Sequence, residues 1–164
     1  MTLFKPKQTE DIATPSSDLD FLLRERISNQ WTGFLHALSD ELLSQLTPQE
    51  CRDFLRSVGT RLAKAMPIPT QDTVPELETA INEKLGAQRW GRVELIDTGS
   101  HLQIRHHYCP LPLALCMDAQ VAGGLLEGLY ELWFRSVGAE EGLSIVQTGA
   151  SADGSVLEFK FGQN

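Results

Sequence analysis

The sequence is poor in several residue types, and each shortage excludes a class of protein. Three cysteines among 164 residues form an odd number, and a chain of this length folds without disulfides. The longest apolar run, residues 109–117, contains two prolines and is far shorter than the roughly 18 residues that a membrane span requires. We therefore expect free thiols, a reducing compartment and no membrane insertion.

Basic charge is also scarce, with 14 Lys and Arg against 22 Asp and Glu and a formal net charge of −8. No stretch gathers enough Lys or Arg to neutralise a row of phosphates, which argues against nucleic acid and anionic membrane surfaces as partners. The N-terminus lacks the apolar core and small-residue cleavage site of a secretory signal. Export by the usual route is therefore not expected.

What the sequence does contain is the composition of a folded domain, with 41% hydrophobic and 22% charged residues. Residues 1–16 are polar, carry two prolines and show no periodicity, so we expect a flexible N-terminal arm there. The remainder, residues 17–164, is expected to form one domain.

Helical periodicity dominates the first half of that domain. It predicts helices over residues 18–30, 32–46, 48–66 and 73–85. The third of these begins at a capping box, in which Thr47 and Glu50 flank a proline at the first helical position. The side chains predicted to face inward from the second and third helices are Phe34, Leu35, Leu38, Leu42, Leu46, Phe54, Leu55, Val58 and Leu62.

Alternating polar and apolar residues then predict two β-hairpins, over residues 93–106 and 143–161, with Pro110 and Pro112 closing the first. Helices followed by sequential antiparallel hairpins predict an α+β fold. Its helices would pack on a four-stranded antiparallel sheet built from the two hairpins.

A broadly apolar helix is predicted over residues 121–137, between the hairpins. Gly124 and Gly128 are four residues apart on one of its faces, so another backbone could approach closely, either in the core or across an interface between copies. As an oligomer interface we therefore consider Gly124, Gly128, Tyr130 and Trp133.

His106, His107 and Cys109 form the best candidate for a metal site, with His101 and Cys116 near them in the sequence. Neighbouring residues of a strand point to opposite faces, so only His107 and Cys109 could share a metal ion. Their spacing matches no zinc motif. We expect no metal and no other cofactor.

Cys51 and His36 could meet as nucleophile and base, but a cysteine in the first turn of a predicted helix is more typical of a buried small side chain. A helix N-terminus lowers a thiol pKa, which leaves a reactive, non-catalytic thiol open. Trp31, Trp90 and Trp133 could stack on sugar rings, although core packing is the more common role of tryptophan. We predict no enzyme activity.

Several short segments follow one another in a familiar order along residues 31–146. They are Phe34-Leu35-x-x-Leu38, Leu55-Arg56-x-Val58-Gly59, Met66-Pro67-x-Pro69, Thr73-Val74 with Leu77 and Asn82, Trp90-Gly91-x-Val93, and Leu126-Glu127-Gly128-Leu129-Tyr130-x-x-Trp133. In this order they resemble the family of operon protein D from bacterial cellulose synthase operons. Met1-Thr2-Leu3-Phe4 is also similar to the start of that family, with additional residues before the shared region.

The resemblance implies a non-enzymatic accessory protein that promotes export or crystallinity of cellulose and assembles from dimers into a homo-octamer. It also implies partnership with the cellulose synthase complex and with small proline-rich accessory proteins. In that family, N-terminal segments have been proposed to line passageways for nascent glucan chains. Carried over to this chain, that role would place glucan contacts at Thr2, Leu3, Phe4 and Lys5.

Two functions follow from the resemblance and the residues together. Without an export signal, the chain is expected in the cytoplasm near the inner-membrane synthase, where a scaffold that organises synthase complexes is the favoured function. The alternative is a channel that guides glucan chains through its N-terminal segments. A periplasmic location would reverse that preference.

Overall fold

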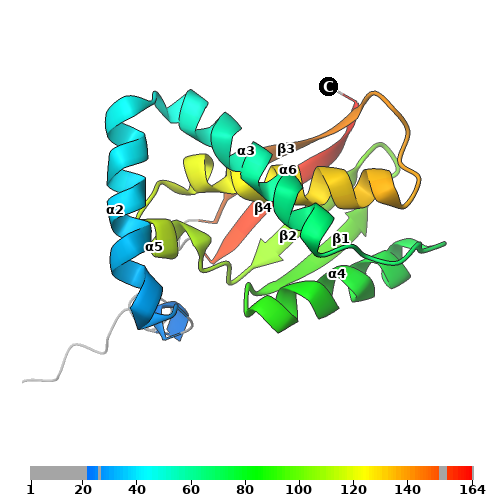
Figure 1. The fold of residues 1–164 in the computed structure, drawn as a ribbon. Coiled ribbons are helices and arrows are strands. Elements are labelled where there is room, and N and C mark those ends of the chain that lie inside the picture. The colour runs from blue at the N-terminus through cyan, green and yellow to red at the C-terminus, as the bar shows by residue number, and fades with distance from the viewer. Residues whose placement is uncertain (1–21, 26, 152–154, 164) are drawn as a thin grey trace, which may run out of the picture.

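A computed structural model of the chain describes residues 22–25, 27–151 and 155–163 (Figure 1). The predicted arm over residues 1–16 lies outside the described residues. In chain order the elements are α2 (Asn29–Gln45), α3 (Pro48–Ala65), α4 (Val74–Gln88), β1 (Arg92–Asp97), β2 (Leu102–His107), α5 (Leu111–Leu115), α6 (Ala119–Ser136), β3 (Leu143–Ala150) and β4 (Val156–Gln163).

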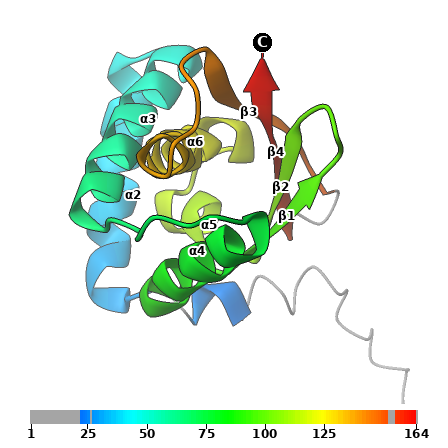
Figure 2. The same cartoon turned by 90° about the vertical axis from the view of Figure 1, so that its right-hand side faces the viewer.

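The four strands form one antiparallel sheet in the order β1-β2-β4-β3. Each predicted hairpin is present, and β2 and β4 join them at the centre of the sheet. The described helices lie on one side of the sheet, with α6 between α3 and the strands (Figure 2). This arrangement confirms the predicted α+β class.

Local sequence signals explain where α3 and α4 begin. The Thr47 hydroxyl accepts a hydrogen bond from the Glu50 N–H, and the Glu50 carboxylate accepts one from the Thr47 N–H, as the capping box predicts. Thr73 caps α4 in the same way, by accepting from the Glu76 N–H. Pro67 lies just past the end of α3, where its missing N–H costs no helical hydrogen bond.

The core lies between α6 and the sheet. Its largest fully buried side chains include Trp133, Tyr130, Phe134 and Phe159. The indole N–H of Trp133 donates to the Met66 carbonyl at 2.8 Å, which satisfies the polar atom of a side chain that is 1% exposed. The helix predicted over residues 121–137 is therefore central, and it runs from Ala119 to Ser136.

Two sequence predictions were wrong about element boundaries. Leu111–Leu115 forms the short helix α5, where prolines had indicated only the end of a hairpin; Pro112 lies in the first turn, where a helix tolerates proline. The first predicted helix was drawn to residue 30, but α2 already begins at Asn29. Within the described part of that first prediction, only residues 22–24 are helical before α2.

Candidate functional site

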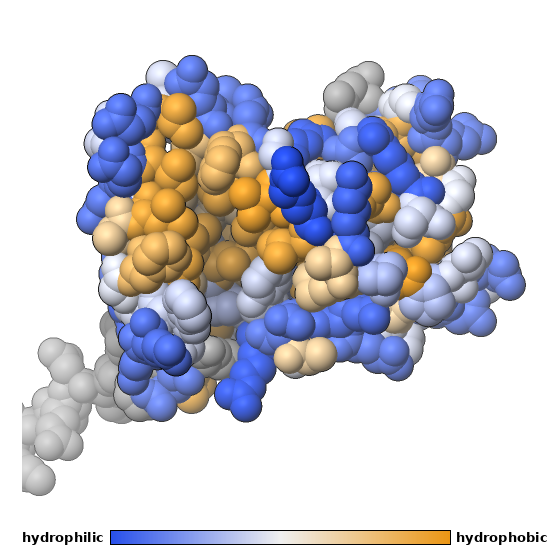
Figure 3. Space-filling model, in the orientation of Figure 1, coloured by the Kyte–Doolittle hydropathy of each residue, from blue (hydrophilic) through white to orange (hydrophobic). Residues whose placement is uncertain are grey.

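An apolar groove of about 570 Å³ opens between α2 and the rest of the molecule. Figure 3 shows it as a hollow in which hydrophobic surface gathers beside α2. Helices α2, α3, α5 and α6 and the connection from α4 to β1 contribute most of the side chains that line it. They include Trp31, Phe34, Leu35, Leu38, Leu42, Phe54 and Arg89.

The groove exposes side chains that the sequence had assigned to the core. Phe34 is 58% exposed, Leu38 40% and Phe54 47%, so the prediction that all three face inward was wrong. The physical reason is the position of α2, which packs mainly on α5 and leaves part of its apolar stripe facing the groove. Leu35 and Leu42, on the same stripe, are half-buried and complete the contact with the body.

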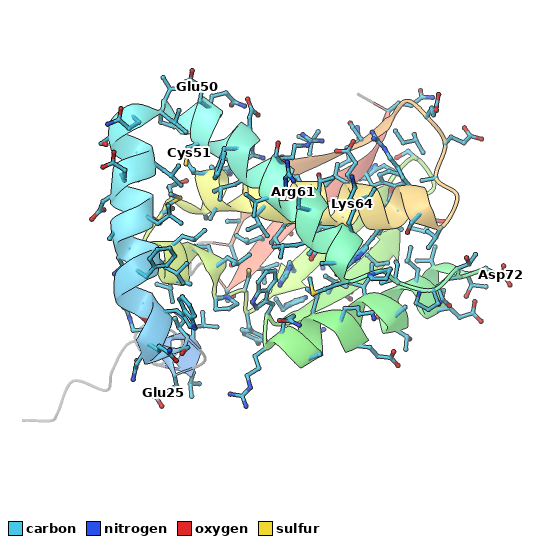
Figure 4. The ribbon with its side chains drawn as sticks, in the orientation of Figure 1. Glu25, Glu50, Cys51, Arg61, Lys64 and Asp72 are labelled. Atoms are coloured by element: carbon cyan, nitrogen blue, oxygen red, sulfur yellow. The ribbon has the colours of Figure 1, made fainter. Side chains whose placement is uncertain are left out.

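Charge is scarce in the groove. Among the described residues that line it, Arg89 is the only charged one. The labelled acidic residues Glu25, Glu50 and Asp72 lie at the periphery of the molecule (Figure 4). A surface of this kind offers few hydrogen-bond partners and favours apolar groups as its occupants.

Trp31 and Phe34, two aromatic residues of the groove, do not form a flat platform. Trp31 and Phe34 lie with their ring centroids 6.0 Å apart and their planes at 75°, edge to face. A glucan chain stacks on rings that lie flat side by side and also needs donors and acceptors for its hydroxyl groups. The groove therefore suits apolar protein side chains better than a polysaccharide.

His106, one of the metal candidates, is buried in the core with both ring nitrogens engaged. Its Nε2 lies 2.6 Å from the Trp90 carbonyl oxygen, and its Nδ1 lies 2.5 Å from the Tyr130 hydroxyl. Because a carbonyl only accepts, Nε2 carries the proton and the Tyr130 hydroxyl donates to Nδ1. Burial lowers the pKa of His106 to about 4, so the ring is neutral near pH 7.

His107 and Cys109, the pair considered for a shared metal ion, do not belong to a ligand cluster. The Nε2 atom of His107 lies 3.6 Å from a carboxylate oxygen of Glu94, on the sheet face opposite His106. Burial raises the pKa of Cys109 to about 12, which keeps its thiol protonated. Within the described part of the chain, no three His, Cys, Asp or Glu side chains are placed to hold a metal ion.

A sequence model of the D-subunit family of cellulose synthase matches residues 17–160. The chain belongs to the cellulose synthase D-subunit family. Two relatives from Komagataeibacter xylinus, each named Cellulose synthase operon protein D, are 32% identical to it. One alignment spans 106 residues, which are 63% of this chain and 68% of the relative. The other spans 127 residues, which are 75% of this chain and 81% of the relative. This confirms the resemblance and implies a part in cellulose biosynthesis.

The remaining candidate residues of this D-subunit family member lie on different elements of the fold. Burial raises the pKa of Cys51, so the lowered thiol pKa that a helix N-terminus could give is not found. His36, considered as a base for Cys51, lies on α2. Cys116 is an exposed free thiol at the end of α5. The Nδ1 atom of His101 lies 3.1 Å from the Thr98 hydroxyl, within the turn of the first hairpin.

The four residues considered for an oligomer interface pack inside the protomer. A Cβ on Gly124 would overlap the backbone of Arg52, and one on Gly128 would overlap that of Arg56, both on α3. Tyr130 and Trp133 are 0% and 1% exposed. The close backbone approach predicted from the glycine spacing thus occurs within one protomer of this D-subunit family member, between α3 and α6.

Thr2, Leu3, Phe4 and Lys5, the expected glucan contacts, lie outside the described residues. Among the helices that the structure describes, none is both long enough and apolar enough to cross a lipid bilayer. The groove was not predicted from the sequence. The sequence indicated the apolar stripes of α2 and α3, but it did not indicate which parts of these stripes remain uncovered.

Proposed function

We propose that this chain serves cellulose biosynthesis as a non-catalytic accessory protein, an oligomeric scaffold that organises synthase complexes and promotes export or crystallinity of cellulose. The observation that carries the proposal is the groove beside α2. It exposes Phe34, Leu38 and Phe54 and is nearly free of charge. Its polar and charged side chains among the described residues are Ser28, Ser39, Gln88 and Arg89. Such a surface is typical of protein–protein contacts.

The titratable side chains support a structural role. The imidazole of His106 is held neutral by burial, and both of its ring nitrogens are engaged in hydrogen bonds. The thiols of Cys51 and Cys109 have raised pKa values, which disfavours the reactive thiolate. Each of these groups fills space or joins elements of the core.

The proposed assembly has the composition that the family resemblance implies. It is a homo-octamer built from dimers, located in the cytoplasm next to the inner-membrane synthase complex, with a proline-rich protein as a further partner. The alternative function is a glucan-guiding channel whose contacts are Thr2, Leu3, Phe4 and Lys5. The edge-to-face rings and the low polarity of the groove favour the scaffold.

Complementation of a deletion strain tests the proposed function. The strain would receive the wild-type gene, Leu38→Glu in the groove, or Leu43→Glu on the same helix outside the groove, with protein levels matched by immunoblot. Leu38 and Leu43 are 40% and 42% exposed, so the two substitutions carry similar folding costs. We expect Leu43→Glu to restore cellulose yield and crystallinity and Leu38→Glu to resemble the deletion. Full restoration by Leu38→Glu would contradict the proposal.

A further inference from the structure

We propose that the groove beside α2 binds a long-chain carboxylate, with the carboxylate at the N-terminus of α2 and a hydroxyl group on the chain bonded to Ser39. Such a ligand would compete with other proteins for the groove, and for this consequence the inference rests on the proposed function. Three features of the described residues support the site: a buried hydroxyl without a partner, an uncapped helix end near an arginine, and the size and lining of the groove.

The hydroxyl group of Ser39 is buried in the wall of the groove without a partner. Ser39 lies within α2, lines the groove and is 1% exposed. Its Oγ makes no hydrogen bond with any residue that the structure describes. A hydroxyl in a helix can donate to the carbonyl four residues earlier, as Thr60 does to Arg56. Because Ser39 does not, its buried hydroxyl carries an energetic cost that a hydrogen bond to a bound molecule would remove.

The N-terminus of α2 offers an anion site in the same groove. Ser28, the N-cap residue, lines the groove, and its side chain makes no capping hydrogen bond. The first turn of α2 also carries no acidic residue. The first N–H groups of a helix have no partner within it, and together with the helix dipole they favour a negative charge. A carboxylate bound there would accept the hydrogen bonds that a capping side chain normally accepts.

Arg89 adds a positive charge at this end of the groove. It follows directly after α4, and the C-terminal end of α4 lies near the N-terminus of α2 in both ribbon views (Figures 1 and 2). Its guanidinium forms no ion pair with a described residue. Arginine binds carboxylates through paired, charge-assisted hydrogen bonds. The polar end of the occupant is therefore expected to be negative.

The size and lining of the groove fit an alkyl chain between these two polar positions. Its volume of about 570 Å³ lies within the range of roughly 300–1,000 Å³ that is usual for small-molecule sites. Ser28 and Ser39 are about 16 Å apart along the helix axis. The side chains of Leu35 and Leu38, which lie between them, line the groove and are apolar. A fatty acid with a hydroxyl group near the middle of its chain matches this order of polar, apolar and polar contacts.

Fluorescence titration of the purified full-length chain tests the inference, with Trp31 and Trp90 in the groove as reporters. The probes are 12-hydroxyoctadecanoate, octadecanoate and the methyl ester of 12-hydroxyoctadecanoate, each used below the concentration at which it forms micelles. We expect 12-hydroxyoctadecanoate to bind most tightly, with one molecule per chain. Octadecanoate should bind several-fold more weakly, because it leaves Ser39 without a partner. The uncharged ester should bind at least about tenfold more weakly than the hydroxy acid.

Two substitutions assign these preferences to their residues. Ser39→Ala should remove the preference for the hydroxy acid over octadecanoate and leave the affinity for octadecanoate unchanged. Arg89→Gln should weaken the binding of both acids by about tenfold and leave the ester unaffected. Ser44→Ala and Arg92→Gln are the matched controls, because both residues are exposed and neither lines the groove. Both control variants should bind all three probes as the wild type does.

The outcomes separate this inference from the proposed function. Absence of saturable binding, or binding of the acids that is the same in the wild type, Ser39→Ala and Arg89→Gln, would overturn the ligand site. If the site is overturned but Leu38→Glu fails to restore cellulose production, the groove serves a protein contact and the proposed function stands. If the probes bind as expected and Leu38→Glu restores cellulose production fully, the ligand site stands and the scaffold function is contradicted.

Discussion

Gly128 of α6 lies directly against the backbone of Arg56 on α3, so that a Cβ at position 128 would overlap the Arg56 carbonyl oxygen. Gly59 of α3 lies equally close to the Leu125 carbonyl of α6. Helices α3 and α6 therefore cross in backbone contact, each supplying a glycine. This contact sets the position of α3, which forms one wall of the groove.

Substitution of Gly128 by alanine should destabilise the protein, because the added methyl group forces the two backbones apart. Overpacking of this kind costs about 1–3 kcal/mol of unfolding free energy, more than alanine gains as a better helix former. Urea unfolding followed by circular dichroism measures it. The matched control is Gly86→Ala in α4, where a Cβ meets nothing within 4 Å and stability should stay equal or rise. Equal effects at both positions would contradict the backbone contact.

Replacement of Asn82 by alanine should weaken the fold and open the edge of β1. The N–H and carbonyl of Val93 would both lose their partner, at a cost of about 1–3 kcal/mol. The freed edge should also increase aggregation, seen as light scattering at high protein concentration. Glu83→Ala, an exposed neighbour on α4, should change neither quantity.

The buried imidazole of His106 predicts a pH dependence of stability. Its pKa falls from about 6.5 in the unfolded chain to about 4 in the fold, mainly through burial, with His107 adding a smaller effect. Between these values the unfolded chain binds a proton that the folded chain does not. The contribution of the neutral His106 ring to the free energy of unfolding is therefore fully present above pH 6.5. It is lost as the pH falls toward 4.

Urea unfolding at pH 7 and pH 4.5 measures this loss, which for His106 amounts to about 2–3 kcal/mol. His106→Gln removes the titrating ring, and its loss of stability over the same interval should be smaller. The carboxylates change the free energy of unfolding with pH by the same amount in both proteins, so their effect cancels in the comparison. Identical pH profiles for the two proteins would show that His106 is not buried in its neutral form.

Much of the fold could be predicted because its signals are local. The capping box at Thr47 and Glu50 identified the start of α3, and alternation on either side of the turns at residues 97–100 and 149–154 identified both hairpins. The buried side chains of β2, Ile104 and His106, followed from the same alternation. The short helix α5 was missed because its prolines also occur in loops.

The groove could not be predicted, because a helical stripe of apolar residues does not reveal what covers it. Phe34 and Leu42 belong to one stripe, yet only Leu42 packs against the body of the molecule. The difference arises from how α2 is placed relative to α3 and α5, which depends on contacts between distant segments. The same limit applied to Gly124 and Gly128, whose spacing predicted a close backbone approach without naming the partner helix.

Hydroxyl-radical footprinting at increasing protein concentration tests whether the proposed oligomeric scaffold assembles through the groove. Trp31 and Phe34 should be oxidised more slowly as dimers form, because their exposed rings become buried. Tyr108, which is 42% exposed and does not line the groove, provides the internal reference and should keep a constant rate. Constant oxidation of Trp31 and Phe34 across a range in which the chain demonstrably dimerises would show that the two copies meet elsewhere.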